Sequence, residues 1–161
     1  MNRAHPGAVI SAAMLLGVGL GGFVDGILLH QILQWHNMLS SRVPPTDLVA
    51  LKYNMVWDGL FHAFTWLTTV LGVGLLWRAG MRPESPGATR LLTGGLLLGW
   101  GTFNLVEGLI DHQILSLHHV HPGAGQTAWD LGFLASGVAL AALGGALIAS
   151  GDRRARSPLP G

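Results

Sequence analysis

Histidine and acidic side chains in this chain occur inside stretches of sequence that are otherwise apolar. The candidate ligands among them are His30, His62, His112, Asp58, Glu107, Asp25, Asp111, His36 and His118. Burying such groups is expensive unless they are paired or bind a cation. Imidazole nitrogen and carboxylate oxygen suit iron, copper or zinc, so these residue types predict a transition-metal site.

Spacing along a regular helix limits which of these residues could share an ion. With a rise of about 1.5 Å per residue, Asp25 and His36 would share a face but stand about 16 Å apart. His30 would point about 140° away from Asp25 on the same helix. We therefore expect that no single ion binds all three of these side chains on a straight helix.

The best local pairs are four residues apart, and two of them occur: Asp58 with His62, and Glu107 with Asp111. A complete site would need ligands from at least three helices, which a helical bundle can supply. Two opposed histidines would instead suit the axial positions of a haem b. The favoured ligands are His30, His62 and His112, with Asp58 and Glu107 as additional ligands or as groups that orient the imidazoles.

The composition places these residues in a membrane protein. Of 161 residues, 50% are hydrophobic and 11% are charged, against about 25% charged in soluble domains. This composition argues against a disordered or nucleic-acid-binding protein. Since cysteine is absent, disulfides, zinc-thiolate sites and cysteine nucleophiles are excluded.

Four stretches have the roughly 20 apolar residues that a membrane helix requires. They are residues 8–35, 55–77, 91–117 and 128–150. Together they predict a single transmembrane domain over residues 1–151, followed by a cytoplasmic tail at 152–161. The elements that carry the candidate ligands are therefore membrane helices.

The basic residues predict the orientation of these helices. Seven lie in the N-terminal segment, the middle connection and the C-terminal segment: Arg3, Arg78, Arg82, Arg90, Arg153, Arg154 and Arg156. The other two connections carry only Arg42 and Lys52. By the positive-inside rule both termini are cytoplasmic, and we expect a multi-pass protein of the cell's inner membrane. The candidate ligands then lie in the extracytoplasmic half of the protein.

One segment of the chain is repeated. The run from Asp25 to His36 matches the run from Glu107 to His118 without a gap, and both contain His-Gln-Ile-Leu. The following spans match more weakly, through Trp-Asp pairs that end at Asp58 and Asp130. The predicted fold is all-α: an integral membrane four-helix bundle of two tandem two-helix repeats, with a pseudo-two-fold axis along the membrane normal.

Several of these motifs resemble a known family. They are Phe23-Val24-Asp25-Gly26, the run His30 to His36, the run Asp58 to His62, Glu107-Gly108, and His112-Gln113-Ile114-Leu115. From about Gly17 to Gly151 the chain resembles small bacterial membrane proteins catalogued as domain of unknown function 2243. The resemblance implies an integral membrane protein of about four helices, and it carries no known activity.

Three functions follow as hypotheses, and the sequence leaves open whether the protein is an enzyme. The first is a metal or haem site in the extracytoplasmic half, for redox chemistry or metal handling. Its candidate partners, besides the lipid bilayer, are a respiratory-chain protein or further copies of the chain, and not nucleic acid. The second is a proton-coupled transporter or channel. The third is a non-catalytic assembly factor whose polar groups only hold helices together.

Overall fold

A computed structural model describes residues 5–80 and 87–156, and the elements in these two ranges are all helices. They are α1 (Pro6–Val24), which continues as the π-helix η1 (Asp25–Ile32); α2 (Leu48–Ala79); α3 (Ala88–Glu107), which continues as the π-helix η2 (Gly108–Ile114); and α4 (Gln126–Arg156). The prediction of an all-helical fold with four long helices is confirmed.

Helix α2 begins at Leu48, earlier than the apolar pattern predicts, because Asp47 caps it. The Asp47 carboxylate accepts hydrogen bonds from the backbone N–H groups of Val49 (2.9 Å) and Ala50 (3.0 Å). Such a cap satisfies donors that the first turn of a helix would otherwise leave open. At the other end of the chain, α4 continues to Arg156, so the expected tail begins inside a helix. The rest of that tail, residues 157–161, lies outside the described residues.

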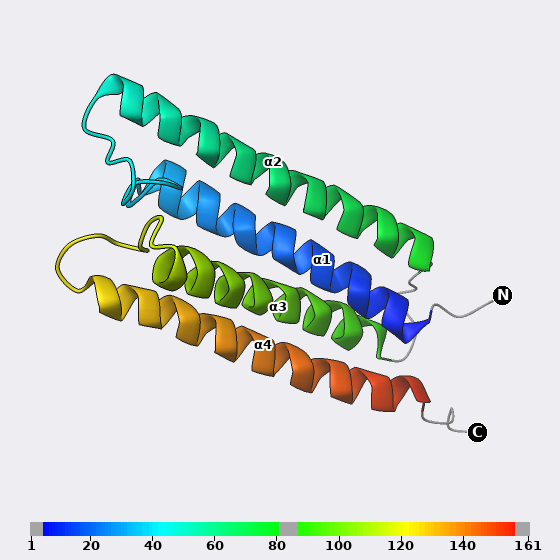
Figure 1. Cartoon of the computed structure of the whole chain (residues 1–161). Helices are drawn as coiled ribbons and strands as arrows, with labels where there is room; N and C mark the ends of the chain where they lie inside the picture. The colour runs from blue at the N-terminus through cyan, green and yellow to red at the C-terminus, as the bar shows by residue number, and fades with distance from the viewer. Residues whose placement is uncertain (1–4, 81–86, 157–161) are drawn as a thin grey trace.

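The four helices lie in a row, in the order α2, α1, α3, α4 (Figure 1). Helices α1 and α3 occupy the middle, and each packs against the following helix of its own hairpin. Within the described ranges α2 and α4 do not pack against each other, so the arrangement is more open than the bundle we expected. Both termini lie at one end of the helices, and the connections 33–47 and 115–125 lie at the opposite end.

Glycines allow α1 and α3 to approach closely at the centre of the row. A Cβ atom on Gly17 would meet the backbone carbonyl of Leu96, and one on Gly99 would meet the backbone carbonyl of Met14. Contacts of this kind between small residues replace the hydrophobic effect as the main cause of helix association within a membrane. Glycine contacts of the same kind also join α1 to α2 and α3 to α4.

Large apolar side chains cover the outer faces of the helices. On α2, for example, Trp66, Leu67 and Leu71 are all more than half exposed. Among the described residues, three helical stretches are long and apolar enough to cross a membrane: Pro6–Ile32, Leu48–Ala79 and Gln126–Ala155. Helix α3, which carries Asn104 and Glu107, lies between two of them. Lipid-facing surfaces of this kind are what a membrane-embedded fold requires.

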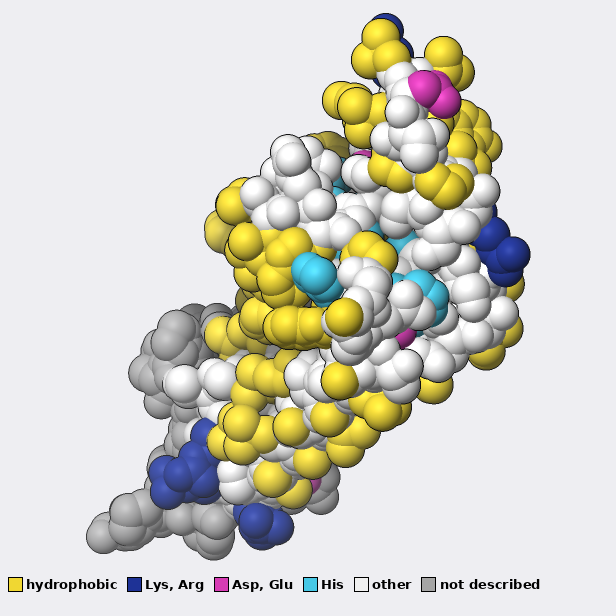
Figure 2. All heavy atoms as spheres, turned by 90° about the vertical axis from the view of Figure 1, so that its left-hand side faces the viewer, with side chains coloured by type: hydrophobic (Ala, Val, Ile, Leu, Met, Phe, Trp, Pro, Cys, Tyr) yellow, Lys and Arg dark blue, Asp and Glu magenta, His cyan; other side chains and the backbone are white. Residues whose placement is uncertain are grey.

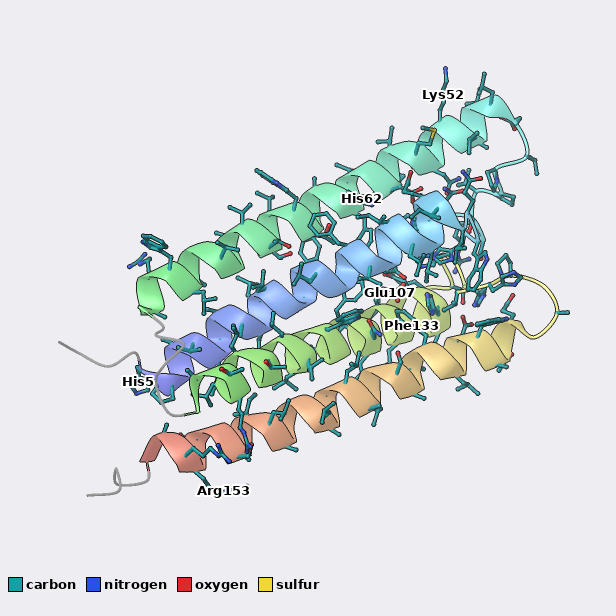
Figure 3. The ribbon with its side chains drawn as sticks, turned by 180° about the vertical axis from the view of Figure 1, so that it is seen from behind. His5, Lys52, His62, Glu107, Phe133 and Arg153 are labelled. Carbon is teal, nitrogen blue, oxygen red and sulfur yellow. The ribbon has the colours of Figure 1, made fainter. Side chains whose placement is uncertain are left out.

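The two ends of the protein along the helix axes differ in their side chains. Figure 3 labels His5 and Arg153 at the end that holds the termini, and Lys52 at the opposite end. Figure 2, which views the opposite end, shows histidine side chains among apolar and uncharged ones. The candidate ligands therefore belong to the end of the molecule that is far from the termini.

The glycine contact between α1 and α3 gives a first testable prediction. We expect Gly99→Ala to destabilise the protein by about 1–3 kcal/mol, since a backbone carbonyl cannot move aside as a side chain could. Gly74→Ala on α2 is the matched control, because a Cβ there meets nothing within 4 Å. It should be neutral, or stabilising by up to about 1 kcal/mol. Thermal unfolding in mild detergent measures both, and equal effects would contradict the close contact.

Candidate metal centre

The two π-helical segments bring an acid and a histidine together on each central helix. A π-helix bonds residue i to residue i+5, so residues five apart come close to one face. His30 Nε2 lies 3.4 Å from Asp25 Oδ2, and His112 Nε2 lies 2.9 Å from Glu107 Oε1. The expectation that His30 points away from Asp25 is therefore wrong, because it assumed α-helical periodicity.

Each π-helix ends in a sharp reversal of the chain. Gln34 and Ser116 have φ angles of 52° and 47°, in the left-handed region that non-glycine residues seldom adopt. The reversal at Gln34 folds His36 back, so that its ring centroid lies 4.4 Å from that of His30. The large separation expected between His36 and the helix that precedes it is also wrong, because the helix ends before His36. Unusual backbone angles of this kind are found most often at functional sites.

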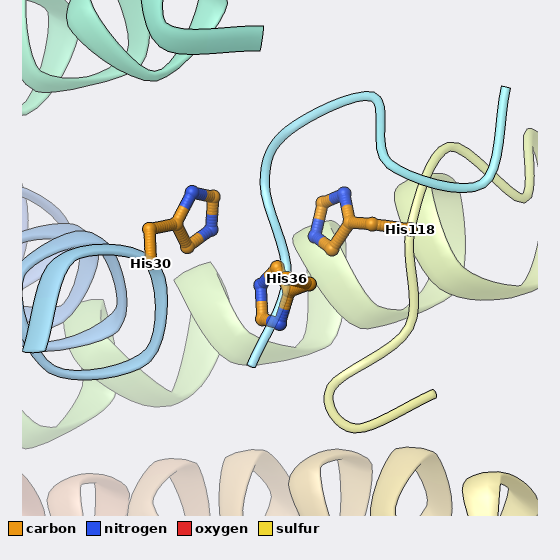
Figure 4. Close-up of side chains that lie close together, drawn as sticks. All are labelled: His30, His36 and His118. Carbon is orange, nitrogen blue, oxygen red and sulfur yellow. The ribbon is translucent and has the colours of Figure 1, made fainter. Parts of the chain in front are cut away.

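Four buried imidazoles form the centre of the site: His30, His36, His112 and His118. Their exposed fractions are 4% or less. The ring centroids of His36 and His118 lie 4.5 Å apart with the planes only 11° from parallel, and those of His112 and His118 lie 4.9 Å apart. Figure 4 shows three of the four side chains converging from separate segments of the chain. We call these four residues the histidine cluster.

In the first half of the cluster, the Nδ1 atoms of both imidazoles are held by acceptors. His30 Nδ1 donates to Asp58 Oδ1 (2.9 Å), and His36 Nδ1 donates to the carbonyl of Val120 (2.9 Å). A neutral imidazole has one donor and one acceptor nitrogen, so these bonds leave the lone pair on Nε2. Both Nε2 atoms are buried and have no hydrogen-bond partner among the described residues.

The second half is arranged around Glu107. His118 Nδ1 donates to the carbonyl of Met38 (3.0 Å), while the Nε2 atoms of His118 and His112 both lie 2.9 Å from Glu107 Oε1. His112 Nδ1 lies 3.5 Å from Asp130 Oδ1. Within the described residues, His112 Nδ1 and Glu107 Oε2 lack a hydrogen-bond partner. Two imidazoles therefore direct nitrogen atoms at one carboxylate oxygen.

Asp58 orients its histidine and fixes the following loop. Its carboxylate accepts from His30 Nδ1, from the side-chain amide of Asn37 (2.7 Å) and from the backbone N–H of Met38 (2.8 Å). With three donors around it, this acid acts in the structure as an anchor for an imidazole. The geometry agrees with the second of the two roles expected for Asp58.

Asp130 in the second hairpin corresponds to Asp58 in the sequence repeat, but it was not among the candidate ligands. Its carboxylate accepts from the backbone N–H of Val120 (3.0 Å) and from His119 Nδ1 (2.7 Å), and it faces His112. The signal was present in the sequence, because the repeat pairs Asp130 with Asp58. Met38 and Val120 act through their backbone, so their side chains could not identify them in the sequence. Asn37 acts through its side-chain amide, but no motif marked it.

Two candidate ligands make no hydrogen bond or ion pair with the histidine cluster in the described part of the chain. His62 Nδ1 donates to the backbone carbonyl of Asp58 (2.7 Å), and its Nε2 edge packs against Gly26. Asp111 is half-buried and lines, with Glu107 and apolar side chains, a cavity of about 280 Å³. Neither pair of residues four apart therefore forms a chelate in this structure.

The donor atoms of the cluster are close enough for metal binding. Two sets have ligand atoms that all lie within 4.8 Å of one another: His30, His36 and His118, and Glu107, His112 and His118. Ligands about 2.0–2.2 Å from an ion lie at most about 4.4 Å apart, so small side-chain movements would complete either set. The residues present thus fit a nitrogen- and oxygen-ligated transition metal.

The burial of His36 predicts a pH dependence of the metal-free protein. Burial, together with the nearby His118 and His30, lowers the pKa of His36 to about 2, whereas an unfolded histidine titrates near 6.5. Below pH 6.5 the unfolded chain therefore binds a proton that the folded chain does not. Stability should fall as the pH falls from about 6.5 toward 4, by up to about 1.4 kcal/mol per pH unit from this residue.

Chemical denaturation of the metal-free protein at a series of pH values measures this slope. His36→Gln, which cannot titrate there, is the matched variant and should show a shallower slope. Identical slopes in the two proteins would contradict a neutral, buried His36.

The comparisons with known proteins agree with the membrane assignment. A family model described as "Predicted membrane protein (DUF2243)" matches residues 12–151, a range that includes the whole histidine cluster and its anchoring residues. The resemblance found in the sequence motifs is confirmed. No curated protein and no solved structure matches the chain.

Proposed function

The chain belongs to the DUF2243 family of predicted membrane proteins, and we propose that it is a metal-binding member, which holds a transition metal in the histidine cluster for redox chemistry or metal handling. The site lies in the half of the protein far from the termini. With the charge pattern of the sequence, this half faces the extracytoplasmic side of a bacterial inner membrane.

One observation carries this proposal: the buried Nε2 atoms of His30 and His36 make no hydrogen bond in the described part of the chain, where Asp25 Oδ2 lies 3.4 Å from that of His30, although both Nδ1 atoms are anchored. Buried polar atoms are normally satisfied, and each exception needs an explanation. Histidine ligands of metals characteristically donate their other nitrogen to a carboxylate or a backbone carbonyl. Asp58 and the Val120 carbonyl provide those two kinds of acceptor.

The donor set favours particular metals. Imidazole nitrogens with carboxylate oxygens, and no thiolate, suit iron, copper or zinc. A bare ion fits better than haem b, because the ring centroids of neighbouring imidazoles in the cluster lie only 4.4–6.5 Å apart. We therefore propose an ion ligated by side chains of the chain itself.

We also propose that the two hairpins are tandem copies related by a pseudo-two-fold axis along the membrane normal. Several contacts support this, because they have a counterpart in the other half. His36 donates to the carbonyl of Val120, and its counterpart His118 donates to the carbonyl of Met38. Such an exchange of partners is what a two-fold relation between copies produces, with the axis passing between the stacked rings.

A proton-coupled transporter or channel is less well supported. Transport would need a polar path from the cluster to the end that holds the termini. In the described chain, that direction is occupied by the close contact of α1 with α3, where Gly17 and Gly99 meet backbone carbonyls. The structure thus favours a site that is closed on the cytoplasmic side.

Metal analysis of the purified protein tests the proposal. The protein should be expressed with added iron, copper and zinc, purified in mild detergent, and measured by elemental analysis beside His112→Ala and His5→Ala. We expect at least one bound ion per chain in the natural protein, an unchanged metal content in His5→Ala, and a lower metal content in His112→Ala. Metal far below one per chain would contradict the proposal. Equal metal content in all three proteins would favour an assembly factor.

A further inference from the structure

We infer that the histidine cluster holds two neighbouring divalent first-row metal ions, each bound by two histidines and one carboxylate. The inference rests on the proposed metal-binding function and specifies the composition of that same site. The two ligand sets are Asp25, His30 and His36 for one ion, and Glu107, His112 and His118 for the other.

Each set comes from one π-helix and the reversal that follows it. In the second set, the donor atoms of Glu107, His112 and His118 lie within 4.8 Å of one another. In the first set, Asp25 Oδ2 lies 3.4 Å from His30 Nε2, and the His30 and His36 rings lie 4.4 Å apart. Among the described residues only the second set has all three donor atoms within 4.8 Å, because in the other converging group His118 takes the place of Asp25. Each half of the chain thus supplies two histidines and one carboxylate, and the first set closes on an ion only after side-chain movement.

The anchoring bonds prevent the imidazoles from bridging between ions. In three of them, His30, His36 and His118, Nδ1 already donates to an oxygen acceptor, which leaves only Nε2 for a metal. Each of these imidazoles therefore forms one bond to one ion. Four imidazoles and two carboxylates exceed the four ligands of a tetrahedral ion, but they match two ions with two histidines and one carboxylate each.

The buried charge supports the same count. The carboxylates of Asp25, Asp58, Glu107 and Asp130 are each 6% exposed or less. Within the described structure these four groups pair with His30, His112 and His118, which are neutral when they bind metal, and Asp130 also pairs with His119, which is in neither ligand set. Buried charges must be compensated, and two divalent cations balance four carboxylates, whereas one cation leaves two negative charges, of which a protonated His119 would offset one.

The two ions would be close neighbours. His118 Nε2 contacts Glu107 of the second set, and His118 also belongs to a group whose ligand atoms lie within 4.8 Å of those of His30 and His36. Because His118 contacts residues of both ligand sets, the two ions would be close enough for their unpaired electrons to interact. Each ion keeps coordination positions that the three protein ligands do not fill, as in other sites with two histidines and one carboxylate.

Stoichiometry at saturation tests this inference. Metal-free protein in detergent should be dialysed against zinc(II), and separately against copper(II), with metal and protein then quantified. We expect about two ions per chain in the natural protein and about one in either His30→Ala or His112→Ala. Electron paramagnetic resonance of the copper(II) form should show interacting spins in the natural protein and an isolated copper(II) spectrum in each variant.

The outcomes separate this inference from the proposed function. One ion per chain at saturation, with an isolated copper(II) spectrum, would overturn the two-ion site and leave metal binding intact. Loss of all metal in either single variant would overturn it as well, because it indicates one shared site. No binding of either metal by the natural protein would contradict the metal-binding function itself. Since the natural protein gives the primary count, a variant that fails to fold does not remove the test.

Discussion

Replacement of His118 by alanine is expected to lower metal affinity by at least 100-fold, an order-of-magnitude estimate based on the 10–100-fold losses seen when only the partner of a ligand is removed. His118 is fully buried, and its Nε2 atom lies 2.9 Å from Glu107 Oε1. It belongs to both groups of converging ligand atoms. Its loss removes a nitrogen donor from one ion and changes the packing beside His30 and His36, which bind the other. Competition with a chelator of known affinity measures the change.

His119→Asn is the matched control for this variant. His119 adjoins His118, but its Nδ1 donates to Asp130 and its ring lies 6.4 Å from that of His112; asparagine retains a donor at that position. Asn37 makes the equivalent bond to Asp58 in the first hairpin. We expect His119→Asn to bind metal as the natural protein does. Undiminished affinity in a folded His118→Ala protein would exclude His118 as a ligand. His118→Gln, which keeps a donor for the Met38 carbonyl, separates lost ligation from lost structure.

Asp58→Ala is expected to have the largest effect on stability, about 3–5 kcal/mol, which is typical for removal of one partner from a buried ionic network. Asp58 is 1% exposed, and its carboxylate accepts hydrogen bonds from His30, Asn37 and Met38. Alanine leaves these three donors without an acceptor and releases the imidazole of His30. The expected loss of stability is therefore accompanied by weaker metal binding.

Asp47→Ala on the same helix provides the comparison. Asp47 is exposed and caps α2 by accepting from the backbone of Val49 and Ala50, so its removal should cost about 1 kcal/mol. It should leave metal binding unchanged. Denaturant titration of both variants in detergent measures the difference. If Asp58→Ala costs no more than Asp47→Ala, the carboxylate does not anchor the site as the structure indicates.

Much of the architecture could be predicted from apolar length and charge. The helices, their order along the chain, and the end that carries the acids and histidines all follow from hydropathy and from the positions of arginine. The open row could not be predicted, because it depends on which faces of α1 and α3 meet. Gly17 and Gly99 allow that contact, but a glycine in a membrane helix does not identify its partner.

The structure brings together most of the residues named from the sequence, but in another geometry than an α-helix predicts. An α-helical period places His30 far from Asp25, whereas the π-helix brings them together. The reversals at Gln34 and Ser116 carry no glycine that would have signalled a positive φ. Local conformations that propensity disfavours are held by tertiary contacts, so they are the features that single-sequence reasoning misses.

X-ray absorption at the edge of the bound metal tests the central claim most directly. The purified, metal-loaded protein should show only nitrogen and oxygen ligands at about 2.0–2.2 Å, with the outer-shell scattering characteristic of imidazole. The imidazole contribution should decrease in His118→Ala and persist in His119→Asn. A first shell without imidazole, or the absence of any metal after supplementation, would contradict a metal centre built from the histidine cluster.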